Sequence, residues 1–187
     1  MSLLKNFYPY EYCESVFDID YQKLFDKGYR GIIFDIDNTL VPHGAPSTPQ
    51  ADALFERVRD IGFQTFLLSD NGKKRIEMFL ENIDNCPYID NAGKPKPDNF
   101  LKAVALMGLK KEEVVCIGDQ IFKDILGANR SGLANILVKF IGWQTETHPG
   151  KRRQVEFMIL RRYAHSRYRH RLGDIAADKP AKEKVHG

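Results

Sequence analysis

The chain has 187 residues and a mass of 21.5 kDa, a size typical of one domain with its own hydrophobic core. A hydrophobic content of 43% and a charged content of 28% exclude a wholly disordered chain. No apolar run approaches the about 18 residues that a membrane span needs. The first residues are interrupted by Lys5, Glu11 and Glu14 and do not resemble a signal peptide. Three widely spaced cysteines indicate reduced thiols, so we expect a cytoplasmic location.

The net charge of +3 is unevenly distributed along the chain. Residues 151–171 contain eight lysines and arginines and one acid, Glu156, so this segment carries +7 and the remainder −4. A mildly acidic body with a basic segment favours an anionic partner for that segment.

Short apolar runs alternate with amphipathic segments between residues 31 and 133. In chain order the pattern predicts a strand at 31–35, a helix from Pro49 to about 61, a strand at 63–68, a helix at about 76–83, a short apolar piece at 88–89, a helix at about 98–107, a strand at 114–118, a helix at about 121–131 and a strand at 136–138. Ser47-Thr48-Pro49 is a typical helix start, and Gly62, Gly108 and Gly132 are typical helix ends. The alternation predicts an α/β fold, a Rossmann-like parallel sheet with helices on both faces.

Two intervals in this pattern are short. Residues 39–68 have room for a loop and one helix, and residues 72–93 for one helix and a short piece. Neither has room for a further inserted domain that could cover the sheet edge as a cap, so we expect a capless, open site.

The basic segment 151–171 is predicted to form a helix after Pro149-Gly150, with an apolar stripe at Phe157, Leu160, Ala164 and Tyr168. The stripe is imperfect: Arg153 and Arg171 fall on the same face, and Val155 and Ile159 on the opposite one. The plain interpretation is a helix partly packed on the domain with its arginines outward. We divide the chain into an α/β domain with its lead-in at 1–145, a basic helical extension at 146–172 and a disordered tail at 173–187.

Polar residues follow three of the predicted strands: Asp35-Ile36-Asp37, Ser69-Asp70-Asn71 and Gly118-Asp119. Ligands of open α/β sheets bind beyond the carboxyl ends of the strands. Several carboxylates gathered there repel one another unless a cation relieves them, and Mg²⁺ is the natural hard cation for oxygen ligands.

The spacing of Asp35 and Asp37 suits phosphoryl transfer. If the chain stays extended there, both side chains lie on one face, so one carboxylate can attack phosphorus while the other moves protons. Mg²⁺, Lys94, the Ser69 hydroxyl and loop N–H groups are available to neutralise the phosphate oxygens.

These residues also resemble a known family. Asp35-Ile36-Asp37-Asn38-Thr39-Leu40 is similar to the first motif, DxDxT, of the haloacid dehalogenase (HAD) superfamily; Ser69 matches the second motif, Lys94 the third, and Gly118-Asp119 with Asp124 the fourth. The presence of Asp at both 35 and 37 resembles the phosphatase branch. The start LLKNFYPYEY, Gly118-Asp119-Gln120 and the segment 127–132 resemble the YqeG type of subfamily IIIA, related to phosphatidylglycerophosphate phosphatases.

The resemblance implies a role for each matching residue. Asp35 would be the phosphorylated nucleophile and Asp37 the general acid/base. The metal ligands would be Asp35, the Asp37 backbone carbonyl and Asp119. Phosphate would be bound by Ser69 and Lys94, with Asn71 as a further contact or a turn residue, and Thr39 and Asp124 would support the site.

Several assignments have alternatives. Lys94 directly precedes Pro-x-Pro and fits the family better than Lys96. Asp124 suits either metal-site support or a helix salt bridge. Asp70 stands where the family is expected to have Asn, and its extra charge either weakens phosphate binding or points to solvent.

The sequence therefore predicts a Mg²⁺-dependent phosphomonoesterase that works through an aspartyl-phosphate, with a bulky substrate, phosphatidylglycerophosphate being the first choice. The segment 151–171 suits an anionic membrane surface, which would make the protein peripheral at a membrane, and equally suits RNA. The alternative function is an RNA- or protein-binding adaptor with an accessory or vestigial HAD site.

Overall fold

The computed structural model describes residues 3–142, 150–173 and 175. Six strands form one sheet with the order β1-β6-β5-β2-β3-β4, and every neighbouring pair is parallel. The strands are β1 (Glu11–Cys13), β2 (Gly31–Phe34), β3 (Gln64–Leu68), β4 (Tyr88–Ile89), β5 (Val114–Gly118) and β6 (Ala134–Val138). The four predicted strands are confirmed, and the short apolar piece at 88–89 is a strand.

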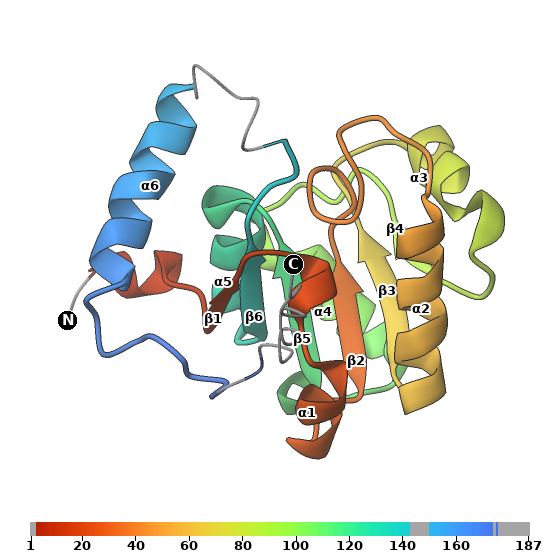
Figure 1. Cartoon of the computed structure of the whole chain (residues 1–187), viewed down its shortest axis with the longest axis horizontal. Coiled ribbons are helices and arrows are strands. Elements are labelled where there is room, and N and C mark those ends of the chain that lie inside the picture. Colours follow the sequence, from red (N-terminus) through yellow and green to blue (C-terminus); the bar gives the residue numbers. More distant parts are fainter. Residues whose placement is uncertain (1–2, 143–149, 174, 176–187) are drawn as a thin grey trace, which may run out of the picture.

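Helices cover both faces of the sheet (Figure 1). They are α1 (Tyr21–Asp26), α2 (Pro49–Ile61), α3 (Lys73–Phe79), α4 (Pro97–Met107), α5 (Leu126–Ser131) and α6 (Lys151–Tyr163), with a π-helical turn at Ile121–Ile125 and 3₁₀ turns at Leu3–Phe7, Val16–Asp18, Leu80–Asn82 and Lys111–Glu113. On β2, the side chains of Ile32 and Phe34 join the core under α1, α2 and α3, whereas Ile33 joins the core under α4 and α5. This alternation is the period of two of a strand buried on both faces, as predicted.

The helix ends follow their sequence signals. Thr48 caps α2, its hydroxyl accepting a hydrogen bond from the Ala51 N–H over 3.2 Å, and Pro49 is the first helical residue. Gly62 ends α2 at φ +113° and Gly108 ends α4 at φ +65°, a backbone conformation that favours glycine.

The links between the central strands are short. The chain joins β2 to β3 through a loop and α2, and β3 to β4 through α3 and a 3₁₀ turn. Residues 35–93 are all described and contain no separate cap domain, so the expectation of a capless fold is confirmed.

The basic helix α6 packs on the domain in a way that differs from the prediction. It ends at Tyr163 rather than near 171, and its buried residues are Glu156, Ile159 and Tyr163. Ala164, assigned to the apolar stripe, is exposed, and Ile159, assigned to the opposite face, lies in a core cluster with Tyr8, Ile121, Ile125, Leu137 and Tyr163. The periodicity misplaced this face because part of it is polar.

Arg153 and Arg171, the two arginines that periodicity placed on the face of the apolar stripe, are turned towards the protein. Arg171 donates to the backbone carbonyls of Tyr8 and Pro9, and its guanidinium lies 3.6 Å from the ring centroid of Tyr10. Arg153 contacts Asp119 and is described below.

The expected disordered tail is described at Gly173 and Ile175, and the prediction is wrong at Ile175. This side chain is 1% exposed, and its carbonyl accepts a hydrogen bond from the Asp20 N–H over 2.8 Å. Burial of an apolar side chain fixes the backbone there. The other residues after 173 lie outside the described residues.

Candidate active site

The candidate site lies at the carboxyl edge of the sheet, where β2, β5 and β3 end beside one another. Asp35 follows β2, Ser69 follows β3 and Asp119 follows β5, while Lys94 comes from the loop before α4. The parallel sheet thus brings together the four motifs that were predicted to cooperate.

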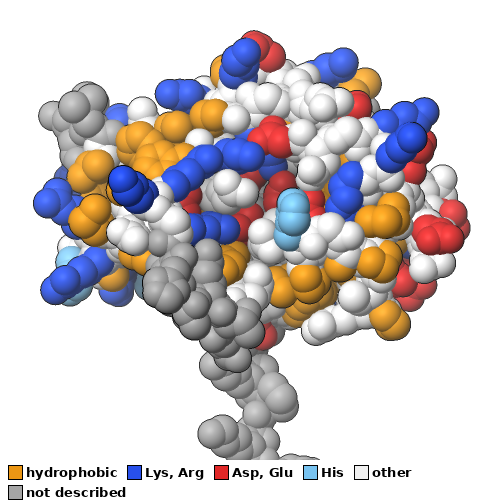
Figure 2. Space-filling model, turned by 90° about the horizontal axis from the view of Figure 1, so that it is seen from above, with side chains coloured by type: hydrophobic (Ala, Val, Ile, Leu, Met, Phe, Trp, Pro, Cys, Tyr) orange, Lys and Arg blue, Asp and Glu red, His pale blue; other side chains and the backbone are white. Residues whose placement is uncertain are grey.

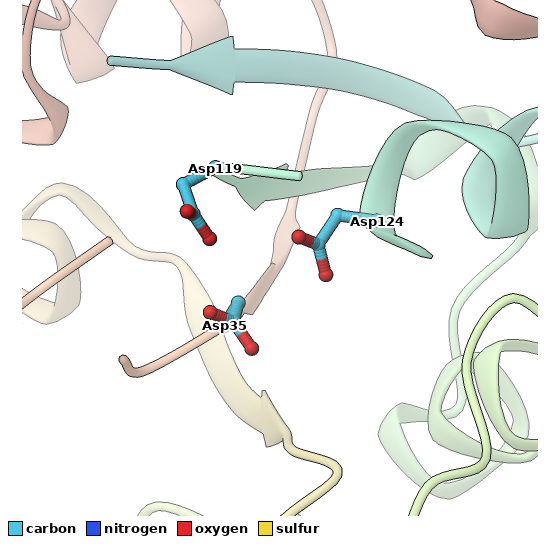
Figure 3. A group of neighbouring side chains, drawn as sticks. All are labelled: Asp35, Asp119 and Asp124. Atoms are coloured by element: carbon cyan, nitrogen blue, oxygen red, sulfur yellow. The ribbon is translucent and has the colours of Figure 1, made fainter. Parts of the chain in front are cut away.

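Three carboxylates converge at the centre of the site. Asp35, Asp119 and Asp124 each offer an oxygen within 4.8 Å of the others, and Figure 3 shows the three side chains pointing towards one another. The side chain of Asp119 is 0% exposed and that of Asp124 is 7% exposed. Water therefore screens little of their mutual repulsion.

The close approach of Asp124 depends on a glycine. A Cβ at Gly118 would lie 2.4 Å from Asp124 Cγ, which no side chain at this position could tolerate. The π-helical turn that follows β5 then presents Asp124, and its Oδ2 accepts a hydrogen bond from the Gln120 N–H over 3.0 Å. Glycine is thus required at position 118, because any larger side chain there would displace Asp124.

Lys94 bridges two of the three carboxylates. Its Nζ lies 2.6 Å from Asp35 Oδ1 and 2.6 Å from Asp124 Oδ1, and its side chain is 3% exposed. Burial alone would lower the pKa of Lys94, but Asp124 and Asp35 outweigh burial and raise it, so the ammonium is charged at neutral pH. Lys96, the alternative considered above, is exposed at the start of α4.

The cluster holds more negative charge than Lys94 can balance. Burial raises the pKa of Asp35 to about 6, with Asp124 and Asp37 adding to the effect and Lys94 opposing it. Burial raises the pKa of Asp119 to about 7, reinforced by Asp35 and Asp124 and opposed by Arg153. Asp119 Oδ1 is buried without a hydrogen-bond partner among the described residues. Oxygen donors with excess negative charge and an unpaired oxygen fit a hard divalent cation.

Asp37 has different partners from this cluster. Its Oδ1 accepts a hydrogen bond from the Gly44 N–H over 2.8 Å and forms an ion pair with Arg75 Nη2, also at 2.8 Å. Its Oδ2 accepts a hydrogen bond from Asn71 Nδ2 over 2.5 Å. Its carboxylate is therefore fixed in one orientation, facing the same pocket as Asp35.

Ser69 and Thr39 complete the surroundings of the two aspartates. Ser69 Oγ accepts hydrogen bonds from the N–H and Nδ2 of Asn71, at 3.2 and 3.3 Å. Since these use only its oxygen, the Ser69 hydroxyl proton is available for another acceptor. Thr39 Oγ1 donates to Asp35 Oδ2 over 3.3 Å.

An open pocket of about 120 Å³ connects these groups with solvent. Its wall includes Asp35, Asp37, Ser69, Asn71, Lys94 and Lys123. Figure 2 shows acidic side chains within a hollow on this side of the molecule, with lysine and arginine side chains around it. An anionic group entering the pocket therefore meets cations at its border and in its wall.

Asp70 is paired rather than free. Its Oδ1 accepts from the Lys94 N–H over 2.9 Å and its Oδ2 pairs with Lys123 Nζ over 2.8 Å. Burial opposes it, but Lys123 and the Lys94 N–H lower the pKa of Asp70, so it is ionised and neutralised by Lys123. Asp70 thus holds the Lys94 loop in place.

Sequence reasoning did not find Arg75, Lys123 or the contact of Arg153 with Asp119. The sequence contains one indication that Arg75 has a special role. Helix α3 begins with Lys73, Lys74 and Arg75, although cations are unfavourable at the amino end of a helix. Arg153 had been placed on the inner face of its helix by periodicity, but the apolar pattern gave no partner for it.

The parallel sheet, the converging carboxylates and the buried lysine form an open site at the carboxyl edge of an α/β fold, with groups suited to a divalent cation and a phosphate group. Comparisons with known proteins agree. A model of the haloacid dehalogenase-like hydrolases matches residues 43–132. Over 159 residues the chain is 39% identical to "Probable phosphatase YqeG" of Bacillus subtilis (strain 168), covering 84% of this chain and 92% of that protein.

Two further similarities are weaker. The chain is 24% identical over 155 residues to phosphatidylglycerophosphate phosphatase 1, chloroplastic/mitochondrial, of Arabidopsis thaliana, covering 78% of this chain and 44% of that protein. The crystal structure of an uncharacterized protein from Listeria monocytogenes serotype 4b shares the fold, with a TM-score of 0.50, 19% identity, and coverage of 71% of this chain and 99% of that chain.

The 39% identity over most of both chains shows the family. The chain belongs to the haloacid dehalogenase-like hydrolases, as a phosphatase of the YqeG type.

Proposed function

We propose that the protein hydrolyses phosphomonoesters with Mg²⁺ through an aspartyl-phosphate on Asp35. The observation that carries this proposal is the position of Asp35, which lies in the wall of the open pocket and shares Lys94 with Asp124 inside the carboxylate cluster. A nucleophilic carboxylate needs neighbouring positive charge before it can approach a phosphate dianion.

The residues that would hold Mg²⁺ are Asp35, Asp119 and the Asp37 backbone carbonyl, with Asp124 in support. When bound, the cation neutralises the phosphate oxygens and the charge that develops in the transition state. Its fit rests on the unpaired Asp119 Oδ1 and the all-oxygen donor set.

The chain's own residues supply the remaining steps. A carboxylate oxygen of Asp35 forms a bond to phosphorus while the bond from phosphorus to the leaving-group oxygen breaks, and Asp37, entering this step as the carboxylic acid, gives its proton to that oxygen and becomes a carboxylate. Asp37 then takes a proton from water, whose oxygen attacks phosphorus and releases phosphate and the Asp35 carboxylate. Ser69, with its free hydroxyl proton, Lys94 and Asn71 would bind the phosphoryl oxygens.

The direct test is hydrolysis of an aryl phosphate by the full chain, with Mg²⁺ and with a chelator. We expect turnover only with Mg²⁺, and its loss in Asp35→Asn. Absence of Mg²⁺-dependent turnover on lipid, nucleotide, sugar and aryl phosphates alike would contradict the proposal.

We further propose a bulky, surface-presented substrate, with phosphatidylglycerophosphate as the first candidate. The support is the capless pocket, the similarity to a relative named for that activity, and the outer face of α6. That face exposes Lys151, Arg152, Arg161 and Arg162 beside the apolar side chains of Val155 and Met158, which are 39% and 61% exposed. Each cation near an anionic bilayer contributes about 1 kcal/mol.

We also propose that the protein is cytoplasmic and peripheral at a membrane. Among the described residues no helix is both long and apolar enough to cross a bilayer. Cys13, Cys86 and Cys116 are buried free thiols, as expected for a reducing compartment.

Vesicle binding separates this proposal from RNA binding. Wild type should bind phosphatidylglycerol vesicles, and Arg161→Glu/Arg162→Glu should weaken that binding while leaving turnover of a soluble aryl phosphate unchanged. Binding to RNA but not to vesicles would contradict the membrane proposal. The adaptor alternative is less well supported, because a vestigial site would not need the complete arrangement of Asp35, Lys94 and Asp119.

A further inference from the structure

Arg153 of α6 reaches the buried carboxylate of Asp119, 34 positions earlier in the chain. Its Nη2 pairs with Asp119 Oδ2, and its Nη1 donates to the backbone carbonyl of Asp119 over 2.9 Å. One guanidinium therefore fixes both the side chain and the main chain of the same residue.

Arg153 is itself held from two sides. Its Nη1 donates to Glu156 Oε2 over 3.0 Å, and its guanidinium carbon lies 4.4 Å from the ring centroid of Phe140. The other oxygen of Glu156 accepts a hydrogen bond from the Phe122 N–H over 3.4 Å. Glu156 thus links Arg153 to the turn Ile121–Ile125, which carries Asp124. The Arg153 guanidinium therefore has little freedom to move away from Asp119.

The two oxygens of Asp119 have different surroundings. Oδ2 is taken by Arg153, while Oδ1 is buried without a hydrogen-bond partner among the described residues, in a carboxylate that points towards Asp35 and Asp124 (Figure 3). A buried carboxylate oxygen without a hydrogen-bond donor is costly in a protein, and a bound cation would supply the missing partner.

We propose that Arg153 is a positioning residue that orients Asp119 towards the divalent cation, so that α6 forms part of the metal site. This inference rests on the proposed metal-dependent function. Partners that orient metal-ligating side chains typically change metal affinity by roughly 10–100-fold when they are removed. A lysine cannot replace the guanidinium, because a single ammonium lacks the planar pair of N–H donors that reaches both Asp119 Oδ2 and the Asp119 backbone carbonyl.

The opposite role would be a competing cation. An arginine that occupied the metal's own place would have to leave before the metal could bind, and its removal would tighten binding. The structure favours positioning, since Arg153 contacts Oδ2 and the backbone carbonyl and leaves Oδ1 free.

The test is titration of the full chain with Mn²⁺ alone, following the free ion by electron paramagnetic resonance. Arg153→Met and Arg153→Lys should each raise the Kd by roughly 10–100-fold, and Glu156→Gln should raise it less. Arg161→Met, on the exposed side of the same helix, is the matched control and should stay within about twofold of wild type. If Arg153→Met does not fold, Arg153→Lys and Glu156→Gln carry the test.

The outcomes separate this inference from the function on which it rests. If wild type binds Mn²⁺ and both Arg153 variants bind it equally or more tightly, the positioning role is overturned and the proposed function stands. A wild-type Kd for Mn²⁺ in Arg153→Lys would show that the two donors of the guanidinium are not required, and would overturn that part of the inference. If wild type itself binds no Mn²⁺, the metal-dependent function and this inference both fail.

Discussion

Asp35 and Asp37 are separated by one residue, yet their carboxylates belong to two different environments. Asp35 lies with Asp119 and Asp124 and shares the buried ammonium of Lys94. Asp37 is held outside that group by Arg75, Asn71 and the Gly44 N–H. The intervening Ile36 is 0% exposed and lies in the core with Ile32 and Phe34, so the aspartates on either side of it line the same pocket but have different partners.

The difference suggests how one short motif performs two tasks. A carboxylate among acids, with a cation close by, suits bond formation to phosphorus, whereas one fixed by directed hydrogen bonds suits proton transfer at a defined place. The predictions that follow test whether the two environments correspond to two roles.

The largest effect is expected for Asp35→Asn. An amide cannot form the aspartyl-phosphate, so turnover should fall by at least about 10⁴-fold on every phosphomonoester. The measurement is kcat on an aryl and an alkyl phosphate with Mg²⁺. Retention of more than a few per cent of wild-type kcat would assign the nucleophile elsewhere.

Asp37→Asn should depend on the leaving group. An alkoxide must be protonated as it departs, so kcat on an alkyl phosphate should fall by about 10²–10⁴-fold. Nitrophenolate leaves without protonation, so p-nitrophenyl phosphate should still give a burst of one product per enzyme before slow steady-state turnover. Equal loss of the burst and of alkyl turnover would show that Asp37 has the same role as Asp35.

Arg75→Met should produce a smaller loss through the orientation of Asp37. Arg75 Nε and Nη2 lie 3.3 and 2.8 Å from Asp37 Oδ1, and the side chain is 13% exposed. We expect kcat on alkyl phosphates to fall about 10–100-fold with KM little changed, and Arg75→Lys to restore part of it. Lys74→Met, an exposed neighbour in α3, is the control; a rise in KM at constant kcat would place Arg75 in substrate binding instead.

The pH dependence of stability should report the Asp35 environment. The pKa values of Asp35 and Asp119, about 6 and about 7, lie above the ordinary value of 3.8. For metal-free protein, their contribution to the free energy of unfolding is therefore fully present below about pH 4 and lost as the pH rises through about 6 and 7. Mg²⁺ binds the deprotonated groups, so the rise in Tm that it causes should grow over the same range.

Thermal unfolding at pH 5.5 and 7.5, with a chelator or with Mg²⁺, measures this effect, which we expect to be a few °C. Asp119→Asn should flatten both dependences. A Mg²⁺-induced rise in Tm that is as large at pH 5.5 as at 7.5 would contradict the raised pKa values.

Much of the fold and the site's centre could be predicted from local sequence. The buried strands are short apolar runs, and Asp35, Ser69 and Asp119 each stand directly after one, so the sheet must gather them. The brief strand β1 and the buried Ile175 were missed, because three residues of strand and one apolar side chain give no periodic signal.

The partners of the site could not be predicted in the same way. Arg75 and Arg153 lie 38 and 34 positions from the aspartates that they hold, and neither belongs to a motif. Periodicity placed Arg153 on the inner face of α6, but an apolar pattern cannot identify the charged partners of an arginine there, Asp119 and Glu156. Long-range polar contacts depend on the folded arrangement of two elements rather than on the pattern of either.

The most direct test of the central claim is to trap the covalent intermediate. Asp37→Asn, incubated with Mg²⁺ and p-nitrophenyl phosphate and quenched in acid, should carry one phosphate on the peptide that contains Asp35, as detected by mass spectrometry. The same treatment of Asp35→Asn/Asp37→Asn should leave that peptide unmodified. A burst of nitrophenolate without phosphate on the Asp35 peptide would contradict the assignment of Asp35 as nucleophile.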